Sequence, residues 1–180
     1  ALIIGTLNVG GTEKHVLNLI NNIDKKKFCV HLHILGEKGT LFSKVKKDIK
    51  TYYPKTTIRR KFSHFFNFFK VLLRLKLTKP DIIHCFLPLS YFYGGFIGLL
   101  LNHRNVIMSR RSLNNYQNKY KIIPVRKIEK FLHKHSNVIL ANSKAVYNEL
   151  IEEGVKKDKL KLVYNGVSLR KEKKANLSEI

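Results

Sequence analysis

Residues 2–20 read LIIGTLNVGGTEKHVLNLI. The apolar run from Leu2 to Leu7 is typical of a buried strand, and the pair Gly10-Gly11 predicts a tight turn after it. Apolar residues at helical spacing then predict a helix over residues 12–23. A buried strand, a glycine turn and a helix in this order favour an α/β protein with a parallel sheet.

The alternation of strands and helices continues along the whole chain. Further strands are predicted over residues 28–35, 81–85, 106–108, 138–141 and 160–163, with a candidate strand at 56–58 inside an ambiguous stretch. Further helices are predicted over residues 40–48, 62–77, 89–101, 119–135 and 144–153. The strands are continuous apolar runs, which is typical of a parallel sheet that is covered on both faces. The predicted fold class is therefore α/β, a Rossmann-like parallel sheet with helices on both faces.

The chain is strongly basic. Its 180 residues include 35 Lys and Arg against 12 Asp and Glu, a formal net charge of +23. This charge indicates an anionic partner (nucleic acid, an anionic membrane surface or phosphorylated substrates) unless it reflects a general lysine bias of the source. No aromatic pattern typical of RNA readers accompanies the charge, so no nucleic acid is expected and a basic anion- or nucleic-acid-binding module is the alternative function. The two cysteines favour a reducing compartment.

Two stretches raise the question of membrane contact. Residues 82–102 carry no formal charge and are long enough to span a bilayer, but Pro88 and three glycines favour a strand, a loop and a buried helix. Residues 62–77 form an amphipathic helix with a wide phenylalanine face and a basic flank, which could rest on an anionic membrane. We expect that face to pack on the sheet instead, because a covered sheet requires it.

One alternating pattern suggests metal ligands. Cys29, His31 and His33 would point to one face of a strand, and a thiol with two imidazoles could hold zinc. A buried strand with satisfied histidines is the favoured interpretation, so no metal site is predicted.

The glycine turn is a candidate anion site. Gly10 and Gly11 lie between a strand and a helix start, where backbone N–H groups are free and missing Cβ atoms allow close approach. The spacing fits neither the dinucleotide-binding glycine pattern nor a P-loop. Taken alone, the two glycines are equally consistent with a tight turn.

The same segment resembles the opening of family 4 glycosyltransferases, which have the GT-B fold. The resemblance rests on Gly10 to Val16 followed by Leu19, and it continues in the family's order over residues 2–168. The later matches are Pro80 to His84, Ala141 to Ala145, Glu149 to Ile151 with Gly154-Val155, and Val163 to Val167.

The resemblance implies one half of a two-domain enzyme. Residues 1–168 would form the amino-terminal, acceptor-side Rossmann-like domain, and residues 169–180 would begin the interdomain linker or end a fragment. The carboxyl-terminal donor-binding domain, with its paired glutamates, would be absent. Because the chain begins at Ala1 and not at Met, we also expect truncation at the start. A fragment of this kind would be inactive alone.

The resemblance further implies a sugar transfer from a UDP- or GDP-linked donor with retention at the anomeric carbon, without cofactor or metal. The acceptor would be a glycan or a lipid-linked glycan of the cell envelope, and the enzyme would be cytoplasmic or peripheral on the inner membrane face. The residues expected near donor and phosphate are Gly10, Gly11, Thr12, Arg110, Ser143, Asn165 and Gly166. The residues expected near the acceptor are Glu13, His84, Arg111 and Asn115.

The sequence departs from the family pattern at two points. Arg110 stands closest to the position where many relatives have a histidine near the donor sugar. Arginine cannot act as a base, but it could clamp a phosphate with two parallel hydrogen bonds; the alternative is a solvated loop arginine. Ser168 replaces the acid of the usual linker motif, which leaves an inactive, truncated glycosyltransferase open as a further alternative. Ser143 is equally suited to cap a helix.

Overall fold

The computed structural model describes residues 1–54, 60–114 and 124–166. Within these ranges the chain forms one seven-stranded sheet in the order β3-β2-β1-β4-β5-β6-β7, and every neighbouring pair is parallel. The predicted α/β fold with a parallel sheet is thus confirmed. The strands are β1 (Leu2–Ile4), β2 (His31–Ile34), β3 (Lys50–Tyr52), β4 (Ile83–Phe86), β5 (Val106–Arg110), β6 (Val138–Ala141) and β7 (Leu160–Leu162).

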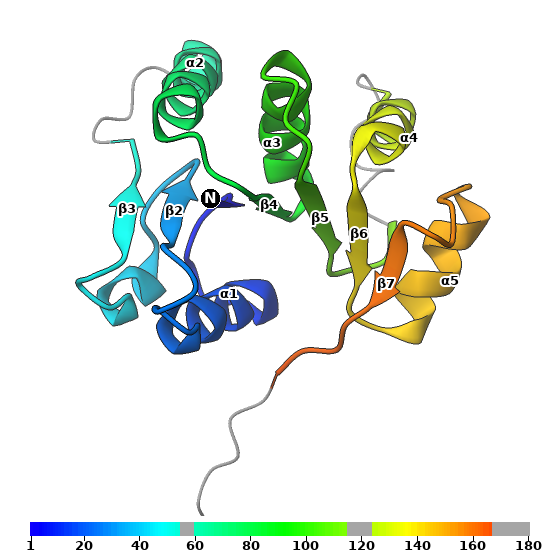
Figure 1. Ribbon diagram of the computed structural model, residues 1–180, viewed down its shortest axis with the longest axis horizontal. Coiled ribbons are helices and arrows are strands. Elements are labelled where there is room, and N and C mark those ends of the chain that lie inside the picture. Colours follow the sequence, from blue (N-terminus) through cyan, green and yellow to red (C-terminus); the bar gives the residue numbers. More distant parts are fainter. Residues whose placement is uncertain (55–59, 115–123, 167–180) are drawn as a thin grey trace, which may run out of the picture.

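The helices divide unequally between the two faces of the sheet. Figure 1 shows α2, α3 and α4 above the sheet and α1 below it. One core cluster joins the sheet to α2, α3, α4 and α5, and a second joins the other face of β1 and β2 to α1 and η1. The helices are α1 (Gly11–Asn22), the 3-10 helix η1 (Thr40–Lys44), α2 (Arg60–Thr78), α3 (Pro88–Leu100), α4 (Val125–His135) and α5 (Lys144–Glu152).

Several boundaries differ from the prediction. The second strand begins at His31 and not at residue 28, because β1 begins at Leu2 and Leu2 already pairs with Leu32. The segment 40–48 contains only a short 3-10 helix. The third strand of the chain is Lys50–Tyr52, while the candidate strand at 56–58 and the start of the helix predicted over 119–135 lie outside the described residues.

The uncharged stretch 82–102 forms β4 and the buried helix α3. Gly94 lets α3 approach the sheet closely, since a Cβ there would overlap the Cys85 sulfur. No helix in the described ranges combines the length and apolar content needed to cross a membrane.

The phenylalanine face of α2 does not pack on the sheet, which corrects the expectation. Val71 and Leu75 are the α2 residues that enter the core, whereas Phe65, Phe66 and Phe69 are 61%, 52% and 49% exposed. The helix is apolar on two opposite sides, and only one side is used by the fold.

The zinc pattern is split by the fold. Cys29 is exposed before β2 and lies 3.9 Å from His31, whereas His33 is buried and its ring stacks on Tyr52 at 4.8 Å between centroids. Within the described ranges neither ring nitrogen of His33 has a hydrogen-bond partner, so it is not the satisfied histidine that we expected. No group of three potential metal ligands occurs among the described residues.

The loop after β1 is fixed by backbone hydrogen bonds to the segment that contains η1. Leu41 donates its N–H to the Leu7 carbonyl at 2.9 Å, and Gly36 donates to Gly5 at 2.8 Å. Gly39 has a φ of 75°, and a Cβ there would overlap the backbone of Leu7 and Asn8. This contact fixes the strand end that leads into the glycine turn.

We expect Gly39→Ala to destabilise the fold by at least about 2 kcal/mol, since it adds left-handed strain and a backbone overlap. Urea unfolding measures the change. Gly11→Ala is the matched control, because a Cβ at Gly11 meets nothing within 4 Å. Equal stability of the two variants would contradict this account of the loop.

We also expect acid to destabilise the protein through His33. Burial lowers the pKa of His33 from 6.5 to about 3, with nearby positive charges adding to the effect. The unfolded chain therefore takes up a proton that the folded chain excludes, and stability falls as the pH drops below about 6.5. Between about pH 7.5 and pH 5 the loss is about 2 kcal/mol, and His33→Phe should remove it. His135→Phe, at an exposed histidine, is the control for urea titrations at both pH values.

Candidate functional site

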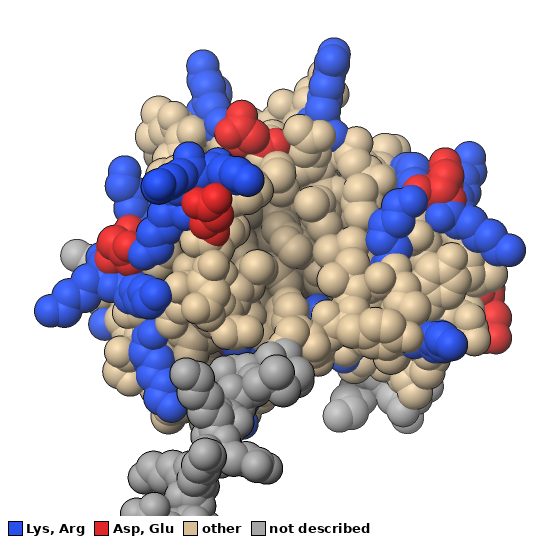
Figure 2. Space-filling view, turned by 60° about the horizontal axis from the view of Figure 1, so that its bottom comes forward, with Lys and Arg blue, Asp and Glu red and all other residues tan. Residues whose placement is uncertain are grey.

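A groove of about 600 Å³ lies on the sheet face beside α1. Right-handed crossovers place α2 to α5 on the other face, so within the described residues no helix covers β4, β5 and β6 here. Figure 2 shows this face as a mostly tan hollow with lysines and arginines, and some carboxylates, around it. The lining residues that matter below are His15, His84, Ser109, Arg111, Leu140 and Val163.

Two adjacent arginines at the end of β5 have different surroundings. The residues of a strand point alternately to opposite faces, so Ser109 faces the groove and Arg110 faces away from it. Arg110 is 1% exposed, and its guanidinium lies 2.8 Å from Glu153, 3.3 Å from Glu149 and 3.7 Å from Glu129. Carboxylates therefore occupy the fork of Arg110, which argues against the phosphate clamp predicted from the sequence.

Arg111 is the arginine that lines the groove. Its Nη2 donates a hydrogen bond to the side-chain oxygen of Asn165, and its buried Nε has no hydrogen-bond partner among the residues that the structure describes. None of the ion pairs found within the described ranges involves Arg111. Burial lowers the pKa of this guanidinium from its usual value, as expected for a cation without a counter-charge.

Two histidines flank Arg111 in a neutral form. His84 contacts the Ser109 hydroxyl at 2.7 Å and stacks on Phe86 at 4.1 Å between ring centroids. Burial lowers its pKa to about 3, and the charges of Arg111 and His15 add to the effect. Burial, followed by Arg111, also lowers the pKa of His15, whose Nδ1 has no partner. Near neutral pH the positive charge of this cluster therefore resides on Arg111.

The glycine turn lies at the carboxyl edge of the same sheet. Gly10 is the N-cap of α1, and the Glu13 carboxylate folds back over it, where a Cβ on Gly10 would overlap it. An anionic group is stabilised there by the free N–H groups and the helix dipole. The Glu13 carboxylate thus lies beside the turn, with Gly11 and Thr12 next to it in the first turn of α1.

The remaining predicted residues fall into three groups. Asn165 contacts Arg111, and Gly166 follows it near Asn18 of α1, whereas Ser143 accepts a hydrogen bond from Val146 N–H and so caps α5. Asn115 lies outside the described residues. Sequence reasoning assigned no role to His15 and Ser109; the alternation of residues in β5 could have identified Ser109 as the neighbour of His84.

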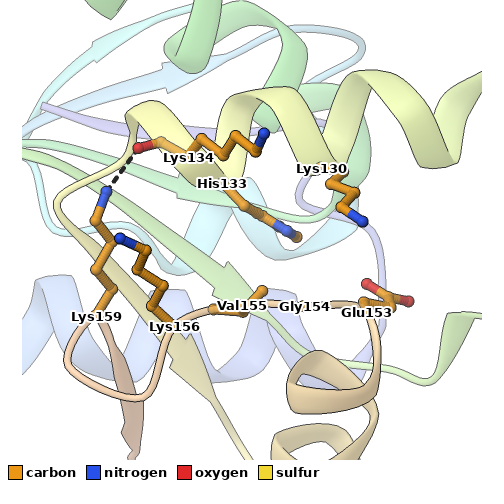
Figure 3. A pocket seen from close by; sticks show the side chains of 8 residues that line it. All are labelled: Lys130, His133, Lys134, Glu153, Gly154, Val155, Lys156 and Lys159. Atoms are coloured by element: carbon orange, nitrogen blue, oxygen red, sulfur yellow. Dashed lines mark hydrogen bonds between the residues drawn. The ribbon is translucent and has the colours of Figure 1, made fainter.

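A second, basic cavity of about 380 Å³ lies at the opposite edge of the sheet. Figure 3 shows Lys130 and His133 of α4 pointing toward the segment after α5, which carries Lys156 and Lys159, while the Lys134 side chain runs along α4. Lys159 donates to the Lys134 carbonyl at 2.6 Å, and burial lowers the pKa of His133 to about 4. Two helices end here, and helix C-termini favour cations, which accounts for the lysines without a ligand.

The carboxylates around Arg110 generate a stability prediction. Arg110→Ala would leave Glu129 and Glu153 without their cation and should cost about 3–5 kcal/mol in urea unfolding, with Arg110→Lys intermediate. The exposed Arg104→Ala is the control. If Arg110→Ala were as stable as the control, the cluster would not stabilise the fold.

Comparisons with known proteins agree with this architecture. The fold resembles several solved structures, such as the lipopolysaccharide outer core galactosyltransferase WaaB in its apo form (TM-score 0.68, 18% identity, 94% of this chain and 46% of that one). Another is HepE of Anabaena in complex with UDP-glucose (TM-score 0.71, 14% identity, 92% and 43%). MurG of Acinetobacter baumannii is also similar (TM-score 0.62, 13% identity, 96% and 47%).

Sequence comparisons identify the family. An uncharacterized 41.2 kDa protein in the cps region of Klebsiella pneumoniae is 31% identical over 176 residues, which cover 89% of this chain and 44% of that protein. The chain therefore spans about half the length of the relatives that it matches. The model of Glycosyltransferase Family 4 matches residues 9–171. The chain thus belongs to glycosyltransferase family 4, and its fold is that of the amino-terminal half of a GT-B enzyme.

Proposed function

We propose that this chain is the acceptor-side half of a retaining glycosyltransferase that uses a UDP- or GDP-linked sugar. The observation that carries the proposal is Arg111, a partly buried cation without a carboxylate partner among the described residues, beside two neutral histidines. HepE was solved with UDP-glucose, which supports a nucleotide-sugar donor here as well. The cps-region relative supports a cell-envelope polysaccharide, as a free or lipid-linked glycan, as the acceptor.

The residues divide the work as follows. Arg111 holds a phosphate group of the donor or acceptor through its fork, with Asn165 positioning the guanidinium. The N-terminus of α1 at Gly10, Gly11 and Thr12 stabilises charge on the leaving phosphate, once Glu13 turns away toward the acceptor. His84 stays neutral and shapes the acceptor side through Ser109.

The remainder of the proposal concerns the whole protein. Residues 1–168 act as one domain, residues 169–180 lead into the linker, and base and ribose contacts come from a second domain. Transfer takes place in the cytoplasm, at the inner face of the membrane, where a lipid-linked acceptor is exposed. Neither a metal nor another cofactor is part of this scheme.

A polyanion-binding module is the second candidate, because the net charge is +23 and four lysines line the basic cavity. The two candidates differ in salt dependence. We would measure binding of the chain to single-stranded nucleic acid and to heparin. An affinity that falls steeply with salt, and that is lost in the double variant Lys130→Gln/Lys156→Gln, would favour this candidate. Sugar transfer does not require that cavity.

The test of the proposed function uses the full-length protein. Its boundaries are found by reading the coding sequence on both sides of this segment, and the whole reading frame is then expressed. Release of UDP or GDP from a panel of nucleotide sugars is measured with and without glycan acceptors. Arg111→Gln should lower kcat/KM by roughly 100-fold, because a transition-state charge contact is lost, and Arg111→Lys should restore part of it.

Lys156→Gln is the matched control, since it removes one charge from the distant basic cavity. Full activity of Arg111→Gln would overturn the assigned role of Arg111. No donor turnover by a folded full-length protein would favour the inactive alternative.

A further inference from the structure

Helix α2 carries an unused apolar stripe on its outer side. Phe65, Phe66, Phe69, Leu73 and Leu77 are 61%, 52%, 49%, 57% and 73% exposed. At 100° per residue, these positions lie opposite Val71 and Leu75, which enter the core. We refer to these five residues as the α2 stripe.

The α2 stripe is ordered by its own aromatic contacts. The rings of Phe65 and Phe69 lie 4.8 Å apart between centroids, and those of Phe65 and Phe66 lie 6.0 Å apart, both edge-on. On the inner side, Phe68 links this set to Tyr93 of α3 at 5.6 Å. The stripe is therefore connected to the core through ring contacts, from Phe69 to Phe68 at 5.8 Å and from Phe68 to Tyr93.

The charges around the stripe identify its occupant. The sequence of α2 contains no acidic residue. Exposed Lys70 borders the stripe on one side, exposed Lys76 lies within its angular range in the last turn, and Lys79 follows just after the helix. Aromatic and leucine side chains with a basic rim are typical of helices that lie in the plane of an anionic bilayer. The 19-residue helix is about 28 Å long, and it presents the apolar side chains along most of that length.

We propose that the α2 stripe docks this protein on an anionic lipid surface. The helix lies parallel to the membrane, the phenylalanines enter the boundary between headgroups and acyl chains, and the lysines contact lipid phosphates. The docking surface is on the opposite face of the sheet from the groove, so the groove stays open.

The orientation of α2 suits a lipid-linked acceptor, and this part of the inference depends on the proposed function. Because α2 runs from the end of β3 back to the start of β4, its first turns lie toward the carboxyl edge of the sheet. Phe65 and Phe66 therefore lie toward the same edge as the glycine turn and Arg111. A lipid-linked glycan leaving the bilayer at Phe65 would meet that edge first.

The absence of tryptophan from the chain makes the test direct. The variant F69W carries one tryptophan in the stripe, and F131W carries one on α4, at a side chain that is 45% exposed. With phosphatidylcholine vesicles containing phosphatidylglycerol, we expect a blue shift of F69W emission and an unchanged F131W spectrum. Pure phosphatidylcholine should give a weaker response, because the lysines lose their partners.

Cosedimentation with the same vesicles measures affinity. The triple variant F65S/F69S/L73S should lower the partition coefficient at least about tenfold, whereas the control L100S/F131S should leave it unchanged. Unchanged binding by the triple variant would overturn the proposal. So would self-association of the chain without lipid that the triple variant abolishes, since the stripe would then bind a second copy. The vesicle experiments contain no nucleotide sugar, so they test docking separately from sugar transfer. If the chain binds vesicles but the full-length protein transfers no sugar, the proposed function is overturned and the docking proposal is supported.

Discussion

The all-parallel sheet is the constraint on which the rest of this structure depends. Parallel strands can be joined only by crossovers, and the right-handed sense of these crossovers decides the face on which each helix lies. The chain turns one way from β1 to β3 and the other way from β4 to β7, so α1 lies on one face and α2 to α5 on the other. The open face of β4, β5 and β6 beside α1 follows from this topology, and the groove with Arg111 lies there.

A second consequence of the topology is that two neighbouring arginines, Arg110 and Arg111, have different surroundings. Arg110 faces the helix-covered side, where its cost of burial is offset by Glu129, Glu149 and Glu153. These contacts join β5 to α4 and α5 and fix the strand end from behind. Arg111, one residue later, faces the open side, where no carboxylate of the described residues forms an ion pair with it. Arg110 thereby stabilises the strand end that carries Arg111, the arginine that we propose binds an anion.

The same topology gives α2 two apolar sides. Its inner side closes the core, and its outer side exposes phenylalanine and leucine with lysines at the rim. Such a surface is costly in water, because exposed aromatic area remains unburied. A lipid surface removes this cost and leaves the opposite face of the sheet accessible, so docking and the groove are compatible with one another.

The sequence by itself determined the α/β class, the parallel sheet and the family, because these depend on local periodicity, turn residues and motif order. It also predicted the glycine turn and the Arg110-Arg111 pair as candidate site residues. Only the tertiary structure decided which arginine faces the groove, because the partners of Arg110 lie 39 and 43 residues away in sequence. It likewise decided that His15 and Ser109 join His84, and that the phenylalanines of α2 face outward. A periodic pattern states that a helix has an apolar side, but only packing against the sheet decides which apolar side the core takes.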